Sequence, residues 1–457
     1  MRRDSIILIC AAPLVVVTVI LALTYPLAAV VLVVVAVLVA FLAIMPEAVA
    51  PILLVAAALF SRPNLLGTNF AVVGLALAAL AAVLSILQDT RINRRLPNGW
   101  STAGWLLVAF FAMFLALQAR GELGDVGELL RPLALTMGTA VSAVIVLSSP
   151  QRRRVVGKLF VTLILVIAGS YAITLAGWLP NGPNAFLVTQ FDSGIAGVAY
   201  RVYVPFTVTL AEFTLPTGLS LPRLTGLGRE PGWMAMYAAF AFFLAPKLGW
   251  RRLWIRALLL LAMLGTFSTA GFAVFVIVLA YEAFLRRHDR LGATATFVLR
   301  TIGLAAVAAA AWVALFAPVI GVDAKSVSDR YSFGQRSDAT VAGVQALLNS
   351  PFLGGGAASV VGGVNLIAAI AMYGVLFSAA TVLAIWWPMI HHTKPAAATA
   401  PVLVVFLTLL TSQPPADSTW AYVSVLIAYA STQVTPLAGG NTDAVTGEGL
   451  AANARRT

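Results

Sequence analysis

The stretch "LGREPGWMAMYAAFAFFLA", residues 227–245, indicates the kind of fold this chain adopts. An arginine, a glutamate and a proline lead directly into a run that is apolar enough to lie in lipid. The whole chain shares this character, because 61% of its 457 residues are hydrophobic, only 10% are charged and the mean hydropathy is +0.96. Soluble domains do not have this composition. The sequence therefore predicts an all-α polytopic membrane protein, with Arg229 and Glu230 placed where burying a charge is costly.

Apolar segments recur along the chain from its first residues. Because a straight span needs about 20 residues, we expect roughly twelve to fourteen transmembrane helices. The shortest segments are expected to be tilted, buried in the bundle or re-entrant. We expect one integral-membrane domain over residues 1–434 and a disordered cytoplasmic tail over residues 435–457. The segments cover residues 5–24, 27–45, 50–61, 70–88, 102–118, 131–148, 159–179, 232–247, 257–267, 271–285, 301–319, 363–389, 399–412 and 420–434.

Basic residues predict the orientation of these segments. If the spans alternate, one side receives the clusters "MRRD", "DTRINRR", "QRRRVVGK", "KLGWRRLWIR", "RRHDRLGATATFVLR", "HHTK" and "ARRT". Loops rich in Lys and Arg stay in the cytoplasm, so both termini are expected there. The two long loops, about 180–231 and 320–362, are then extracytoplasmic. The net charge of +12 thus indicates orientation and not nucleic-acid binding. The first segment reads as a retained helix and not as a signal peptide.

The sequence argues against several classes of function. The cytoplasmic loops are too short for a nucleotide-binding domain and contain no G-x-x-x-x-G-K-[ST] motif. The single cysteine, Cys10, can form neither an intrachain disulfide nor a cysteine metal site. Ion-coupled transporters keep acids or histidines at mid-membrane, and the predicted spans carry almost none. This absence argues against an ion-coupled transporter but does not exclude a lipid flippase. His288, His391 and His392 all fall on the cytoplasmic side, so an external general base has to be an acid.

The first candidate site is the Arg-Glu-Pro unit that ends the first long loop. Pro231 suits the first turn of a helix, where its missing N–H costs nothing. Glu230 is then expected at or beside the N-cap, facing the positive end of the helix dipole. Arg229 and Trp233 flank it at interface depth. An interfacial anchor is the alternative reading, but an anchor needs no acid beside its base.

The second long loop, with "VSDRYSFGQRSDATVAGVQALLNSPFLGGG", carries the second candidate site. We expect a short helix that begins at Ser337 or Asp338 and ends near Asn349. Arg336 would then lie at a helix N-terminus, where a guanidinium, free N–H groups and the dipole together favour an anion such as phosphate. Arg330 lies just before it. Contact with lipid headgroups is the alternative. The expected apolar face of this helix comprises Val341, Val344, Leu347 and Leu348.

Two glycine-containing stretches complete the expected external surface. In "LGTFSTAGFAVF", Ser268, Thr269 and Gly271 separate two short apolar segments and predict a tight polar turn. The glycine triplet 354–356 predicts either a close approach of two backbones or a simple turn.

Together these features resemble the O-antigen ligase/polymerase superfamily, over roughly residues 200–390. The resemblance consists of the many spans, Arg-Glu-Pro at a helix start, the Ser/Thr turn and "GQRSDATVAGVQALLNSPFLGGG". The ligase branch has a histidine before the asparagine that follows these glycines, whereas here Val364 precedes Asn365. The chain therefore looks more like the polymerase branch.

This resemblance implies a metal-independent glycosyltransferase of the membrane-embedded type C in the bacterial inner membrane. Its donor and acceptor would be polyprenyl-diphosphate-linked glycans at the outer leaflet, with no cofactor and no nucleic acid. A flippase and a chain-length regulator are the expected protein partners. The implied catalytic residues are Glu230, Arg229 and Arg336. The substrate-binding residues expected on this reading are Arg330, Arg336, Arg223, Arg201, Trp233, Asn365 and Ser268.

The chemistry of the residues fits this reading. A diphosphate leaving group needs charge neutralisation, which bidentate arginines supply, and a sugar hydroxyl needs a base, which a carboxylate can be. Inversion at the anomeric carbon is expected, because the sequence offers no clear covalent nucleophile. Two alternatives stay open: transfer of a finished glycan to another acceptor, as in a ligase, and transport of a lipid-linked glycan by a flippase.

Overall fold

The computed structural model describes twelve parts of the chain, and most of the described residues are helical. The expected segments 5–24, 27–45 and 420–434, and the expected tail from residue 435, lie outside these parts. The described parts are residues 46–60, 70–92, 100–120, 137–147, 149–195, 198–215, 217–226, 230–285, 292–316, 330–355, 365–390 and 395–411.

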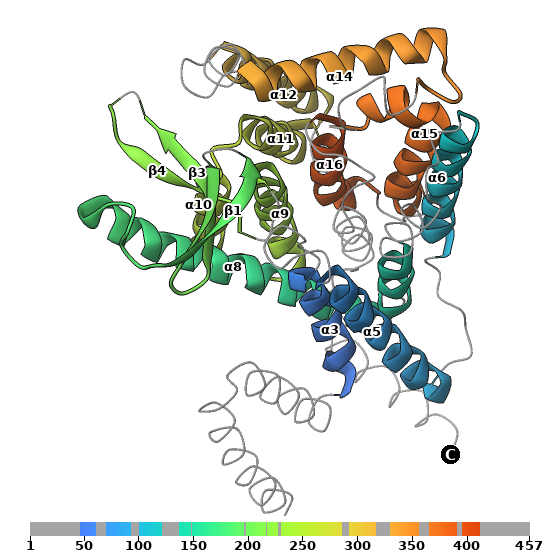
Figure 1. Ribbon diagram of the computed structural model, residues 1–457, viewed down its shortest axis with the longest axis horizontal. Helices are drawn as coiled ribbons and strands as arrows, with labels where there is room; N and C mark the ends of the chain where they lie inside the picture. Colours follow the sequence, from blue (N-terminus) through green and yellow to red (C-terminus); the bar gives the residue numbers. More distant parts are fainter. Residues whose placement is uncertain are drawn as a thin grey trace, which may run out of the picture.

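Helices dominate the fold (Figure 1), and most of them contribute to one apolar core. The N-terminal half holds α3 (Pro46–Phe60), α5 (Phe70–Ile92), α6 (Trp100–Gln118) and α8 (Pro150–Asn181). After the sheet come α9 (Pro231–Leu244), the 3₁₀ turn η1 (Ala245–Leu248), α10 (Leu253–Leu264), α11 (Thr269–Ala280) and the π-helical η2 (Tyr281–Leu285). The last helices are α12 (Ala293–Phe316), α14 (Arg330–Asn349), α15 (Ala368–Ile390) and α16 (Pro395–Thr411).

Two of the described helices are long and apolar enough to cross a membrane. They are Pro150–Asn181 and Ala368–Trp387, the latter within α15. Shorter apolar helical stretches also occur in the described parts, such as Leu253–Leu264 and Thr269–Phe284. Helices do occupy most of the expected apolar segments there, but the structure gives no support for about fourteen spans. The structure supports a mostly helical protein with two candidate spans among the described helices.

The sequence predicted an all-α protein, and this prediction is wrong in the first long loop. This loop forms a four-stranded antiparallel sheet in the order β1-β2-β3-β4. The strands are β1 (Leu187–Ile195), β2 (Val198–Tyr203), β3 (Thr207–Thr214) and β4 (Ser220–Leu224). The residues explain the strands, because "VAYRVY" and "TVTLAEFT" are rich in β-branched and aromatic side chains. The fold is therefore helical with a small sheet, and not all-α.

The sheet packs along the second half of α8 (Figure 1). The Trp178 indole Nε1 donates to the carbonyl oxygen of Ser220 at 2.9 Å, and its ring meets that of Tyr203 edge-on at 5.8 Å. The hydroxyls of Ser170 and Thr207 are 2.7 Å apart. The first half of α8 packs elsewhere, since Gly157 lies against Leu248 of η1. The sheet and the basic start of α8 thus occupy opposite ends of one helix.

The helix α14 packs on α15 and lies across one end of the bundle (Figure 1). Small residues make this contact, because Ala339 is buried and a side chain at Gly343 would overlap the carbonyl of Ile367. The predicted apolar face lies elsewhere: Val341, Val344, Leu347 and Leu348 are all exposed, Leu348 by 78%. Two helix backbones can approach closely only through small residues, so the large side chains point away.

Candidate functional site

The start of α9 has the predicted geometry. Glu230 is the N-cap residue, with extended φ and ψ of −130° and 159°, and Pro231 occupies the first turn. The carbonyl of Glu230 accepts a hydrogen bond from Trp233 N–H at 3.1 Å. The Glu230 side chain is half-buried and does not cap its own helix. Its carboxylate is therefore held at the positive end of a helix without being used as that helix's cap. Arg229 lies outside the described residues.

The first turns of α9 are buried in the core. Trp233 is only 3% exposed, and its ring lies 6.2 Å from that of Tyr237. This packing gives Trp233 a structural role and leaves it little surface for a substrate.

The turn predicted around Ser268 is confirmed. The helix α10 ends at Leu264, and α11 begins at Thr269 with Ser268 as its N-cap. The Ser268 hydroxyl accepts a hydrogen bond from Gly271 N–H at 3.2 Å. A side chain at Gly271 would overlap the methyl group of Ala235, so the start of α11 packs on α9 one turn beyond Glu230. The structure therefore brings the Ser268 turn and the start of α9 to the same end of the helix group.

An apolar cavity of about 410 Å³ lies beside this turn. Tyr171 and Leu175 from α8, Leu221 from β4 and Phe272 from α11 contribute to its wall, and Ser268 also lines it. The Tyr171 hydroxyl donates to the carbonyl of Pro222 at 2.9 Å, which ties α8 to β4. The lining of the cavity is almost wholly hydrocarbon, which suits an apolar chain better than a sugar.

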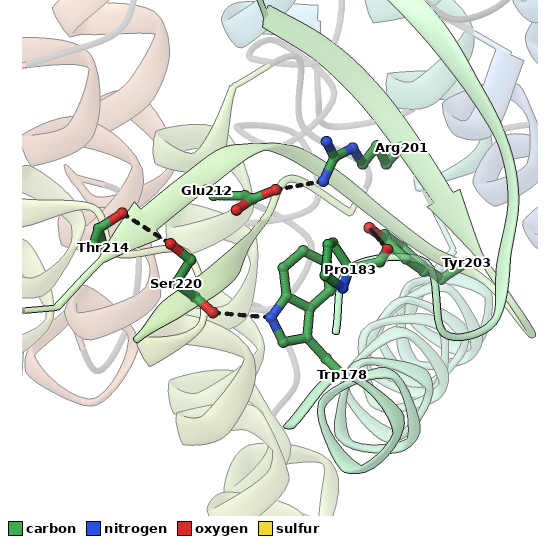
Figure 2. A network of polar contacts seen from close by, with 7 residues as sticks. All are labelled: Trp178, Pro183, Arg201, Tyr203, Glu212, Thr214 and Ser220. Atoms are coloured by element: carbon green, nitrogen blue, oxygen red, sulfur yellow. Dashed lines mark hydrogen bonds and ion pairs between the residues drawn. The ribbon is translucent and has the colours of Figure 1, made fainter. Parts of the chain in front are cut away.

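Of the two sheet arginines predicted to bind substrate, Arg201 already has an ionic partner. Its guanidinium and the Glu212 carboxylate are 2.5 Å apart on neighbouring strands (Figure 2). Partial burial by itself lowers the pKa of Arg201, but hydrogen bonds and charge attraction to Glu212 and Tyr203 raise the pKa overall. Burial in turn raises the pKa of the Tyr203 phenol, whose hydroxyl donates to the carbonyl of Pro183 at 3.0 Å. Arg223 is half-buried on β4, next to Leu224, whose N–H donates to the carbonyl of Gly265.

The expected start of the second-loop helix is wrong. The helix α14 begins at Arg330, so Arg336 lies in its second turn and neither Ser337 nor Asp338 caps it. Only the first four N–H groups of a helix lack an intrahelical partner, so free backbone N–H groups cannot assist the guanidinium of Arg336 in binding an anion. Arg330 holds the terminal position instead. The side chains of Arg330 and Arg336 lie outside what the structure describes.

Asn365 is a structural residue at the junction of α14 and α15. It is 3% exposed, and its Oδ1 accepts a hydrogen bond from Ala368 N–H at 2.8 Å. Its Nδ2 donates to the Thr340 hydroxyl at 2.9 Å. The amide therefore caps α15 and holds α14 against it, which explains the residue without a ligand.

Sequence reasoning missed Arg120, two residues beyond the end of α6. Its guanidinium donates to the backbone carbonyls of Met372, Leu353 and Gly354. Gly354 has a φ of 61°, and a side chain there would collide with the carbonyls of Ile370 and Ala371, so the predicted close backbone approach is confirmed at this glycine. Arg120 belonged to a short polar loop with no motif, and no local pattern connects it to residues more than 230 positions away.

The histidines at 288, 391 and 392 lie outside the described residues. In the parts of the chain that the structure describes, no group of three or more His, Cys, Asp or Glu side chains could hold a metal ion. Comparison of the chain with protein-family models, curated proteins and solved structures found no match.

Proposed function

We propose that this chain is a membrane-embedded glycosyltransferase that polymerises polyprenyl-diphosphate-linked repeat units at the extracytoplasmic face of the bacterial inner membrane. The observation that carries the proposal is the placement of Glu230. A carboxylate at a helix N-cap, not used for capping, lies at the end of the helix group that also holds the Ser268 turn and the apolar cavity.

The proposed reaction uses Glu230 as the general base. Its carboxylate accepts the proton of an acceptor sugar hydroxyl while that oxygen bonds to the anomeric carbon of the donor. The bond from this carbon to the diphosphate breaks, and the polyprenyl diphosphate leaves with the electron pair. Attack from the opposite face inverts the configuration. Arg336, Arg330 and Arg229 neutralise the departing diphosphate, because a guanidinium can donate two parallel N–H bonds to it.

The orientation of the site is part of the proposal. Gly157 of α8 packs on Leu248, so the basic residues near 152–158 and 247–256 gather at one end of the helices. Basic residues favour the cytoplasmic side. The sheet and the start of α9 lie at the opposite end, which supports an outward-facing site.

Incubation of the purified protein in lipid nanodiscs with lipid-linked repeat units tests the proposal. A polymerase yields a ladder of products that differ by one repeat unit. A single transfer to a foreign acceptor would indicate a ligase instead. Substrate that crosses the bilayer of a proteoliposome without covalent change would indicate a flippase, and either of these results rejects the polymerase.

A further inference from the structure

A second cavity opens at the far end of α9 from Glu230. It is an open groove of about 640 Å³ between α8 and the residues that join η1 to α10. Leu165 and Val166 from α8 and Leu258 from α10 contribute an apolar wall. Such a wall favours a hydrocarbon chain over water.

The mouth of this groove is cationic. Gly249 ends η1 in the left-handed conformation, with a φ of 90°, and turns the chain toward α10. Arg251 and Arg252 follow it, line the groove and are exposed. Within the part of the chain that the structure describes, neither guanidinium forms an ion pair. The groove therefore combines an apolar wall with two available positive charges.

The segments that form the groove carry no acidic residue. Every charged residue of α8, and every charged residue of 231–280, is Lys or Arg. Some of these cations are already engaged: Arg152 Nε donates to the carbonyl of Val146 at 2.8 Å, and the Arg256 guanidinium lies 5.8 Å from the centre of the Phe242 ring. Arg251 and Arg252, by contrast, line the groove. A cationic surface of this kind attracts anions.

Two tryptophans in the groove indicate that its ligand is a lipid and not a soluble anion. Trp250 and Trp254 line the groove beside the arginines, and Trp254 is 53% exposed. Leu253, between the arginines and Trp254, is also exposed. Tryptophan and leucine exposed next to arginine are typical of the boundary between headgroups and acyl chains.

We propose that this groove is a binding site for an anionic phospholipid, such as phosphatidylglycerol. The phosphodiester lies at Arg251 and Arg252, and one acyl chain follows the wall formed by Leu165, Val166 and Leu258. Basic pockets between membrane helices bind anionic headgroups in this way. The site is remote from Glu230 and needs the chain to lie in a bilayer, but it does not depend on glycosyl transfer.

Native mass spectrometry of the full-length protein in detergent tests the proposal. Phosphatidylglycerol and phosphatidylcholine with identical acyl chains are added back to delipidated protein, and binding is titrated. The variant Arg251→Gln/Arg252→Gln removes the two charges at the mouth. Arg256→Gln/Arg300→Gln is the matched control, because it removes the same charge from two exposed arginines that do not line the groove.

We expect phosphatidylglycerol to bind more tightly than phosphatidylcholine. Since each basic residue near a membrane surface contributes about 1 kcal/mol, the double variant should bind it roughly 10- to 30-fold more weakly, and the control should bind it normally. Equal affinity for the two lipids, or an equal loss in the control, would overturn the site.

A further variant separates a lipid from a soluble phosphate. Val166→Trp fills the apolar wall and should weaken phosphatidylglycerol binding without touching either arginine. Inorganic phosphate at millimolar concentration should not displace the lipid. If phosphate competes and Val166→Trp binds lipid normally, the groove holds a soluble anion and the lipid proposal is wrong. Thermal unfolding of each variant shows that it is folded.

Discussion

The guanidinium of Arg120 donates a hydrogen bond to the carbonyl oxygen of Met372 at 3.3 Å, next to a break in α15. Gly374 causes the break, with φ and ψ of 81° and 175°. The loop after α14 fills the gap, because Val375 N–H donates to the carbonyl of Pro351 at 2.7 Å. Backbone groups freed inside an apolar bundle need such partners, since leaving them unpaired costs several kcal/mol.

Replacing Arg120 should therefore destabilise the protein. Arg120→Ala removes the donor of three carbonyls, and we expect the free energy of unfolding to fall by about 2–4 kcal/mol. Arg120→Lys should restore part of the loss, because an ammonium reaches fewer of these oxygens. Unfolding in mild detergent measures the effect. Arg300→Ala, an exposed residue of α12, is the control, and an equal effect there would argue against the role of Arg120.

Gly374 should not tolerate a side chain. An alanine there would overlap the carbonyl oxygen of Phe352 and would have to adopt a positive φ. We expect Gly374→Ala to lower the free energy of unfolding by more than about 3 kcal/mol, or to prevent folding. Gly104→Ala is the matched control, since no atom lies within 4 Å of the new methyl group in α6 and alanine favours the helix. Equal melting temperatures for the two variants would show that α15 is not broken at Gly374.

Local patterns predicted the start of α9 and the polar turn before α11 correctly. Glu230 and Pro231 at the start of α9, and Ser268 at the start of α11, act within one turn of chain, so their residue types suffice. The start of α14 was misplaced, because "RYSFGQR" contains polar, glycine and aromatic residues and lacks a clear apolar period.

The pairing of the strands and the contacts between helices could not be read from local patterns. The strands of the first loop are short, and hydropathy alone gives no reason to separate them from an irregular loop. Arg201 was assigned to a substrate because its partner, Glu212, becomes a neighbour only through strand pairing. Asn365 and Arg120 likewise gain their roles from contacts between distant segments. Charge and hydropathy therefore predicted where polar residues gather but not what they bond to.

Ser268 provides a test of the turn beside the candidate site. Ser268→Ala removes the hydrogen bond to Gly271 N–H, and we expect a loss of about 1 kcal/mol in the free energy of unfolding. Ser268→Asp should restore most of it, because aspartate is an equally good N-cap. If both variants are as stable as the wild type, the cap makes no net contribution. A fall in activity with Ser268→Asp at normal stability would favour substrate contact.

The proposed base predicts a large effect of one conservative substitution. Glu230→Gln keeps the size of the side chain but removes its basicity, so polymerisation should slow at least ~100-fold, the low end for a general base. Glu282→Gln is the control, since this glutamate lies in η2 at the other end of α11. Replacing all three histidines with alanine should leave the rate unchanged in folded protein. A near-normal rate for Glu230→Gln would return this residue to the role of an interfacial anchor.

Arg336 distinguishes a diphosphate clamp from a lipid anchor. As an anchor it should be replaced well by lysine, because both side chains reach the interface and carry one positive charge. As a clamp it should not, because an ammonium cannot form the two parallel N–H bonds of a guanidinium. On the proposed function, Arg336→Lys should lower turnover of lipid-linked repeat units by ~10- to 1000-fold, from one or two charge-assisted bonds of about 1.5–3 kcal/mol each. Arg336→Ala should be slower still. Combining it with Arg330→Ala should cost less than the sum of the single variants if both grip one diphosphate.

The matched control for Arg336 is Arg300→Lys, an exposed arginine of α12 outside the candidate site. Arg336 lies inside α14, and a lysine there should keep the helix. Rates are normalised to the amount of folded protein, so that any loss of folding is not counted as a loss of activity. We expect full activity for Arg300→Lys. Full activity for Arg336→Lys as well would make Arg336 an anchor and remove it from the donor site, while Glu230 could still be the base.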